Sequence, residues 1–229
     1  MCFSAAGSFA LSGILGAVGV TSLARTSSRP HRMFAAVPLI FAAQQATEGI
    51  VWLTMVDLGN AVLNRLAVST FLGFALVVWP FWVPLSVRMM ERSPARLRVL
   101  TALSWFGGLV GVSAALLLAR WQPVASIAGH SIRYDYPGTS DAPIHFLLLV
   151  AYAASVVLPL FLSTAKLART IGVVLVVSVM MTVLIQRDAF TSVWCFFAAI
   201  LSGLIAVAVA RDQRSSAIPL AEQLSPARP

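Results

Sequence analysis

Long apolar runs alternate with short polar breaks along most of the chain. Seven such runs cover residues 3–24, 33–56, 61–87, 99–119, 143–165, 171–186 and 193–210. A run of about 20 apolar residues is long enough to cross a bilayer as an α-helix. The pattern therefore predicts an all-α, polytopic membrane protein with seven transmembrane helices in residues 1–210, followed by a disordered cytoplasmic tail in residues 211–229.

Two stretches interrupt this pattern. The third run contains Trp79-Pro80-Phe81-Trp82-Val83-Pro84, in which each proline removes a backbone donor and predicts a kink. Its paired tryptophans are typical of the aromatic belt at a membrane surface. The longest polar connection, residues 120–142, is rich in Ser, Gly, Asp and Tyr and is expected to form an outer loop with interfacial tyrosines.

Composition supports a membrane location. Of the 229 residues, 59% are hydrophobic and 10% are charged, and the mean hydropathy is +0.88. A soluble domain of this size cannot bury so much apolar surface, so lipid is the expected solvent for most of the chain. The net charge of +8 comes from short basic loops, with no basic stripe of the kind that binds nucleic acid.

The basic residues also predict an orientation. Twelve of the 16 Lys and Arg residues fall in the loops after the first, third and fifth runs and in the tail, and four fall on the other side. Because cytoplasmic loops carry the excess of Lys and Arg, the N-terminus is expected outside and the C-terminus in the cytoplasm. We expect a multi-pass protein of the plasma membrane, the inner membrane of a bacterium.

A single carboxyl group stands inside the second apolar run. Glu48 has Gln44 four residues and Gln45 three residues before it, so a helix places all three on one flank. A carboxylate at membrane depth costs at least about 2.5 kcal/mol, which favours a functional role for Glu48 over a purely structural one. The alternative is a hydrogen-bonded residue that holds helices together.

The predicted topology brings the chemically reactive side chains to the outer half of the membrane. Glu48 precedes the outer boundary at Asp57 by nine residues, or about 13 Å of helix. The other outer candidates are Cys2, His130, Tyr134, His145, Asp188, Ser192 and Cys195. This shared depth predicts an outward-facing polar site.

Three sequence blocks resemble a bacterial family of multi-span membrane proteins of unknown function. They are Met1-Cys2-Phe3-Ser4-Ala5, the segment Ala36–Gln45 with Glu48-Gly49 and Trp52, and Ser192-Val193-Trp194-Cys195-Phe196-Phe197-Ala198-Ala199. The resemblance implies a membrane location and a shared site, but it supplies no reaction.

The two cysteines have three interpretations. On an oxidising outer face, Cys2 and Cys195 form a disulfide. Alternatively, both thiolates with His130 or His145 supply the mixed ligand set of a tetrahedral Zn²⁺ site. The third interpretation is two small, inert, buried side chains.

These observations leave three classes of function. In the first, Zn²⁺ held by Cys2, His130 and Cys195 activates water for hydrolysis or hydration of a small or lipid-like substrate, with Glu48 as ligand or general base. In the second, Glu48, Gln44 and Gln45 bind a cation, a proton or a small ligand in a binding, sensing or permeation protein. The third is structural. The set of ligand-binding candidates is Gln44, Gln45, Trp52, Tyr134, Asp188 and Ser192.

Several membrane protein classes are excluded. A retinal protein needs a Schiff-base lysine in its last span, and residues 193–210 contain no lysine. No HxxxH or HxxxD pattern of seven-span lipid hydrolases lies within a run, and there is no Walker loop or GxSxG motif.

Overall fold

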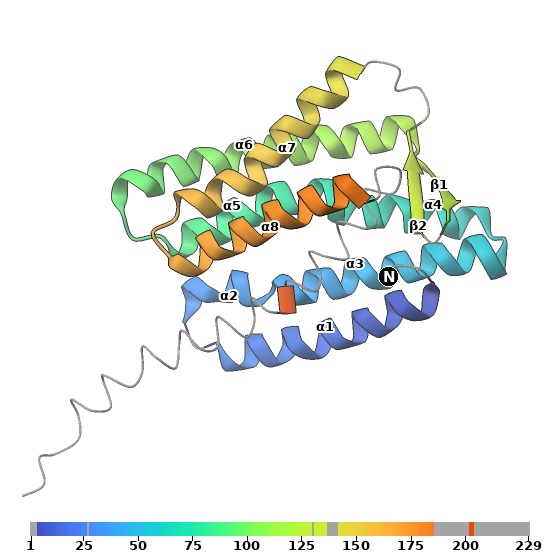
Figure 1. Cartoon of the computed structure of the whole chain (residues 1–229), viewed down its shortest axis with the longest axis horizontal. Coiled ribbons are helices and arrows are strands. Elements are labelled where there is room, and N and C mark those ends of the chain that lie inside the picture. Colours follow the sequence, from blue (N-terminus) through green and yellow to red (C-terminus); the bar gives the residue numbers. More distant parts are fainter. Residues whose placement is uncertain (1–3, 27, 130, 137–141, 186–201, 204–229) are drawn as a thin grey trace, which may run out of the picture.

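The computed structural model describes residues 4–26, 28–129, 131–136, 142–185 and 202–203. These residues are mostly helical and include one antiparallel hairpin (Figure 1). The elements in chain order are α1 (Ala5–Arg25), α2 (Arg29–Ala35), α3 (Val37–Leu53), η1 (Thr54–Leu58), α4 (Ala61–Leu72), η2 (Gly73–Val78), α5 (Trp79–Met90), α6 (Pro94–Trp121), β1 (Val124–Ala128), β2 (Ser131–Asp135), α7 (Ala142–Leu162) and α8 (Lys166–Ile185).

Helices occupy each of the first six predicted apolar runs. Four continuous helices, Ala5–Arg25, Arg29–Val56, Ala61–Met90 and Pro94–Trp121, are long and apolar enough to cross a membrane. Helices α7 and α8 contain the shorter apolar stretches Phe146–Leu162 and Ala168–Met181. The seventh run and the tail lie outside the described residues apart from residues 202–203. The helical class is thus confirmed, and the four long helices are compatible with a membrane location.

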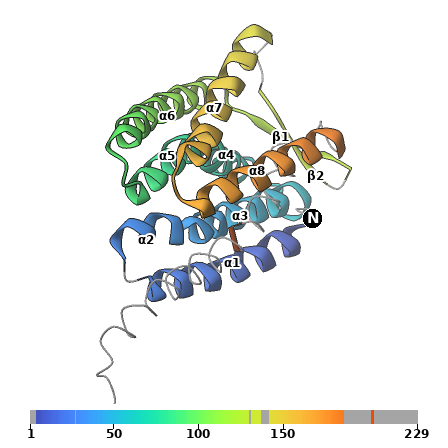
Figure 2. The same ribbon diagram turned by 60° about the vertical axis from the view of Figure 1, so that its left-hand side comes forward.

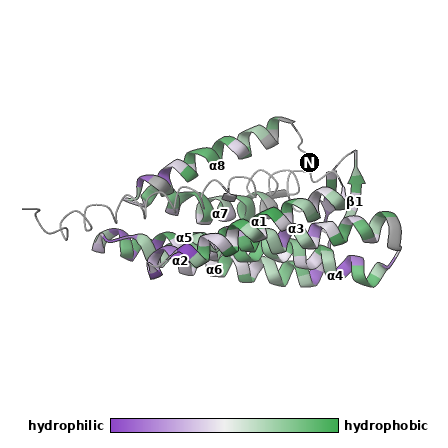
Figure 3. Cartoon of the chain, turned by 90° about the horizontal axis from the view of Figure 1, so that it is seen from below, coloured by the Kyte–Doolittle hydropathy of each residue, from purple (hydrophilic) through white to green (hydrophobic). Residues whose placement is uncertain are grey.

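Apolar side chains also cover much of the outer surface. Trp105 and Leu116 on α6 are 78% and 67% exposed, and Figure 3 shows apolar residues along most of the helix lengths with polar residues towards the ends. A water-soluble monomer rarely exposes so much continuous apolar surface. This surface suits contact with lipid.

Local signals in the sequence explain where the helices begin and end. The side chain of Ser4 accepts a hydrogen bond from the backbone N–H of Gly7 at the start of α1, and Asn60 caps α4 in the same way. Pro94 begins α6, where its missing N–H costs nothing. Gly59 has a φ of +56°, which lets the chain turn between the second and third long helices.

The three basic turns in the described residues lie at one end of the bundle. In Figures 1 and 2, the α1–α2, α5–α6 and α7–α8 turns are on the left, and the β1–β2 hairpin is on the right. Glu91 joins two of these turns, because its carboxylate accepts hydrogen bonds from the N–H of Ser93 at 2.9 Å and of Thr164 at 2.8 Å. The alternation of basic and non-basic loops therefore matches the up-and-down path of the helices.

The third long helix is irregular just before its Trp-Pro pair. Residues Gly73–Val78 form a π-helix, η2, which leads directly into α5 at Trp79. Pro80 lacks the N–H that would bond one turn back, and a π-turn is a common way to absorb such a lost bond. This π-helix lies on the N-terminal side of the proline, and the kink itself stays a prediction.

Tryptophan packing corrects the predicted aromatic belt. Trp79 is only 4% exposed, and its indole N–H is bonded inside the bundle rather than at a surface. The indole of Trp82 donates to the backbone carbonyl of Met33 at 3.1 Å. Both rings therefore connect α5 to the second long helix.

The polar connection after α6 is more ordered than its composition predicts. Strands β1 and β2 pair with Val124 opposite Asp135 and Ala128 opposite Ser131. Side chains alternate across the strands, so Ile132 and Tyr134 face inward and are buried. The Tyr134 ring stacks on Phe71 of α4 with the centroids 5.0 Å apart, so this tyrosine is a packing residue, contrary to the interfacial position expected for it.

Glycines allow α6 to approach the preceding helix closely. A Cβ atom at Gly107 would overlap the backbone carbonyl oxygen of Pro80, and one at Gly111 would lie 2.7 Å from the carbonyl oxygen of Val77. Small residues four apart are typical of helix pairs in membranes, where close backbone contact replaces the hydrophobic effect.

We predict that Gly107→Ala lowers the free energy of unfolding by about 1–3 kcal/mol, because the backbone of Pro80 cannot move aside as a side chain would. Gly108→Ala is the matched control, since its Cβ would meet only the Phe81 ring at 3.7 Å. Thermal unfolding in detergent measures both variants. Equal melting temperatures for the two would contradict the close packing.

A second prediction concerns Glu91, which is 6% exposed. Burial by itself would raise the pKa of Glu91, but hydrogen bonds from three backbone N–H groups and a threonine hydroxyl outweigh it and lower the pKa from 4.5 to about 2. The stability contributed by the ionised group is therefore fully present above pH 4.5 and is lost as the pH falls towards 2.

Glu91→Gln should destabilise the protein by about 2 kcal/mol at pH 7, because bonds to a charged acceptor are replaced by weaker ones. The difference in melting temperature between wild type and Glu91→Gln should shrink between pH 5 and pH 3. A difference that stays constant with pH would rule out the ionised carboxylate as the connecting group.

Candidate functional site

One face of α3 carries the polar residues singled out in the sequence. Gln44, Gln45 and Glu48 are each 0% exposed, although α3 belongs to a helix long and apolar enough to cross a membrane. Helical geometry places residues three and four apart on the same side, so the three polar groups are neighbours along this face. The structure therefore gathers two amides and a carboxyl group inside the bundle.

Helix α5 supplies a polar partner to this face. The indole Nε1 of Trp79 donates to Oε1 of Gln44 at 3.0 Å, and the Trp79 ring stacks on Phe41 with the centroids 4.2 Å apart. An indole N–H can only donate, so the Gln44 oxygen must face Trp79 and its amide nitrogen must point elsewhere. Trp79 thus fixes which end of the Gln44 amide donates to its other neighbours.

Helix α1 closes the opposite side of α3. The Ser12 hydroxyl donates to the backbone carbonyl of Ala42 at 2.8 Å, and a Cβ at Gly49 would lie 2.8 Å from the Phe9 ring. Gly49 follows Glu48 directly, so the absence of a side chain at this position is what brings the two helices together beside the carboxyl group. Small rotations of α3 are restricted by these contacts.

The arrangement can hold a small positively charged ligand. A carboxylate accepts hydrogen bonds or ligates a cation, and amide oxygens are suitable additional ligands. In known metal sites, hydrogen bonds from surrounding residues hold the ligating groups in position. The bond from Trp79 holds the Gln44 amide in a comparable way.

Two other predicted ligand residues have described side chains. Trp52 lies four residues after Glu48 on α3 and is 6% exposed, so it extends the same buried face. Tyr134 lies on β2 against α4, as described above.

The remaining predicted residues are not described in atomic detail. The backbone of His145 belongs to the first turn of α7, but its side chain lies outside the described part. Among the described residues, no group of three or more His, Cys, Asp or Glu side chains is placed to hold a metal ion. The residues that lie outside the described part altogether are Cys2, His130, Asp188, Ser192 and Cys195.

Sequence reasoning missed two contributors. Trp79 was assigned to a membrane surface, although its position well inside an apolar run is a signal for burial. Arg65 is a charged residue within the third predicted run, as Glu48 is within the second, and it lines a pocket at the end of the bundle.

The protein is mostly helical, and its four longest helices are compatible with crossing a membrane. The second of these helices carries two buried amides and a buried carboxyl group. The chain belongs to a family of unknown function, DUF6629, whose sequence model matches residues 1–221. No curated protein and no solved structure matches the chain.

The contact between Trp79 and Gln44 generates a third prediction. Trp79→Phe removes the only donor of the indole and leaves the buried Gln44 oxygen without that bond, which should cost about 1–3 kcal/mol of stability. Adding Gln44→Leu should restore part of this loss, because both polar groups are then absent.

A double-mutant cycle of melting free energies measures the coupling, which we expect to be about 1 kcal/mol. Additive effects of the two substitutions would contradict a direct bond between the side chains.

Proposed function

We propose that this chain is a multi-pass membrane protein of the binding, sensing or permeation class, in which Glu48 binds a small cation, a proton included. Gln44 and Gln45 are its amide neighbours on α3. The observation that carries this proposal is the complete burial of all three side chains on one face of a helix long enough to span a bilayer.

The burial of these three polar side chains has a free-energy cost that supports a functional role. Removing a carboxyl group and two amides from water is unfavourable unless other polar groups or a ligand compensate. Apolar residues at these three positions would pack between the helices without that cost. A small cation is favoured over a larger ligand because the three side chains have no exposed surface through which a bulky molecule would enter.

The proposal includes a topology. Seven spans, with the basic turns in the cytoplasm and the N-terminus outside, follow from the distribution of Lys and Arg. The position of the three described basic turns at one end of the bundle supports this orientation (Figure 1). Glu48 then lies nearer the outer surface of a plasma membrane.

The test uses Glu48→Gln, which keeps the shape of the side chain and removes its charge. The purified wild-type protein should melt several degrees higher as the concentration of one cation, from a set of H⁺, Na⁺, K⁺, Mg²⁺ and Ca²⁺, is raised above its dissociation constant. Glu48→Gln should lose this dependence.

Glu91→Gln is the matched control, since Glu91 is also a buried carboxylate but lies in a turn. It should keep the cation-dependent increase, with the response to H⁺ compared above pH 5, where Glu91 stays ionised. A wild-type protein that responds to none of these cations, or a Glu48→Gln variant that responds as wild type does, would support a purely structural cluster instead.

A second proposal is the zinc centre. Cys2, His130 and Cys195, with His145 as a further candidate, would hold Zn²⁺ and activate water for attack on a small or lipid-like substrate. One observation favours it: the first turn of α1, which follows Cys2 in the sequence, and strands β1 and β2, which flank His130 in the sequence, lie at the same end of the bundle (Figures 1 and 2).

Elemental analysis of the protein, purified without a histidine tag, tests the zinc centre. We expect about one equivalent of zinc per chain, reduced at least tenfold in Cys2→Ser and unchanged in His31→Ala, which alters a histidine at the basic end. A metal-free preparation containing a Cys2–Cys195 disulfide would contradict it.

A further inference from the structure

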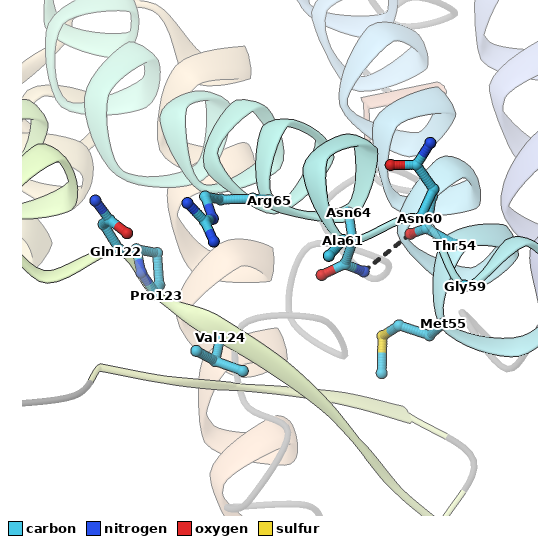
Figure 4. A pocket seen from close by; sticks show the side chains of 10 residues that line it. All are labelled: Thr54, Met55, Gly59, Asn60, Ala61, Asn64, Arg65, Gln122, Pro123 and Val124. Atoms are coloured by element: carbon cyan, nitrogen blue, oxygen red, sulfur yellow. Dashed lines mark hydrogen bonds between the residues drawn. The ribbon is translucent and has the colours of Figure 1, made fainter.

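A pocket lined by both polar and apolar residues lies at the end of the bundle opposite the basic turns. Its volume is about 390 Å³, and it is formed by η1, the start of α4 and the junction between α6 and β1 (Figure 4). This volume is within the usual range for small-molecule sites. The lining residues are Thr54, Met55, Gly59, Asn60, Ala61, Asn64, Arg65, Gln122, Pro123 and Val124.

The described residues that line the pocket carry one positive charge and no acidic side chain. Arg65 supplies the charge, and its side chain makes no ion pair or hydrogen bond within the described part of the chain. Asp135, which lies opposite the lining residue Val124 in the hairpin, is paired with Arg133 at 3.2 Å rather than with Arg65. A guanidinium without a protein partner at a pocket wall favours an anionic ligand.

A second group beside Arg65 is held in place by an unusual backbone conformation. Gln122 ends α6 with a φ of +46°, and it is the one residue other than glycine with a positive φ in the described chain. Figure 4 shows the guanidinium of Arg65 directed towards Gln122 and Pro123. Figure 4 draws the Gln122 amide with its oxygen on the side of Arg65, so a rotation of the amide group about its terminal bond is needed for its nitrogen to donate to the same anion as Arg65.

A chain of hydrogen bonds fixes an acceptor in the same pocket. The Thr54 hydroxyl donates to the backbone carbonyl of Val51 at 2.9 Å, so its oxygen accepts from Nδ2 of Asn64, also at 2.9 Å. This leaves Oδ1 of Asn64 pointing away from Thr54, on the side of the pocket where Arg65 lies (Figure 4). The pocket thus combines a cationic donor with an oriented acceptor.

We propose that this pocket binds an anionic phosphate ester that also carries a hydroxyl group. Arg65 and Gln122 contact the phosphate, and Oδ1 of Asn64 accepts from the hydroxyl. Arg65 lies four residues into α4, about 6 Å along the helix, which is the level of lipid headgroups if this helix crosses a bilayer. A phosphoglycerol headgroup and a soluble glycerol phosphate offer the same chemistry.

The experiment measures binding to the purified full chain in a neutral detergent by isothermal titration calorimetry. The probes are dihexanoyl phosphatidylglycerol, glycerol 3-phosphate and dihexanoylglycerol, which lacks the phosphate. We expect saturable binding of at least one phosphate-containing probe and none of dihexanoylglycerol. Binding of phosphatidylglycerol alone identifies a lipid site, and binding of glycerol 3-phosphate identifies a site for soluble esters.

Arg65→Gln should weaken that binding roughly tenfold or more, because a charged hydrogen-bond donor is lost. Arg120→Gln is the matched control, since Arg120 is an exposed arginine in the last turn of α6 that does not line the pocket. Glu48→Gln should also bind normally, so this result is independent of the proposed cation site. Equal weakening in Arg65→Gln and Arg120→Gln, or no binding of either phosphate probe, would overturn the proposal.

Discussion

The rest of the structure depends on the withdrawal of one carboxyl group and two amides from water inside an apolar bundle. Gln44, Gln45 and Glu48 have no exposed surface, and helices α1 and α5 pack against the helix that carries them. Trp79 reaches them from α5 and orients one amide, whereas the ring of Phe9 occupies the space beside Gly49. Because polar groups are costly to bury, this packing is the observation on which the proposed cation site rests.

Close helix contacts give the bundle the rigidity that such a site needs. Gly107 lets α6 contact the backbone around Pro80, immediately beside the tryptophan that bonds Gln44. At the basic end, Glu91 joins the α5–α6 and α7–α8 turns through bonds to an ionised carboxylate. The continuous helix Ala61–Met90 therefore contacts α6 near Pro80 and is joined to the α7–α8 turn at its C-terminal end. These contacts leave the Trp79 indole little freedom to move away from α3.

The sequence allowed the helical class, the location of six helices and the polar face of α3 to be predicted, because apolar periodicity and an isolated charge are local signals. The partner of Gln44 was not predictable: the position of Trp79 well inside an apolar run indicates burial, but nothing local shows which neighbouring helix its indole faces. The hairpin was missed because Ile132 and Tyr134 alternate with polar residues over only five positions, Ser131–Asp135. The pocket around Arg65 joins residues about 57 positions apart, and only the tertiary fold brings them together.

The most direct test of the burial of Gln44, Gln45 and Glu48 is the reactivity of the Glu48 carboxyl group towards a water-soluble carbodiimide. Mass spectrometry of peptides from protein that was treated while folded measures this reactivity. Asp135 provides an internal reference, since its side chain is 54% exposed. Because Glu48 is buried and Asp135 is exposed, we predict that Asp135 is modified readily, while Glu48 stays unmodified until the protein is unfolded. Modification of Glu48 in the folded protein at the rate of Asp135 would show that water reaches the cluster and would contradict the account.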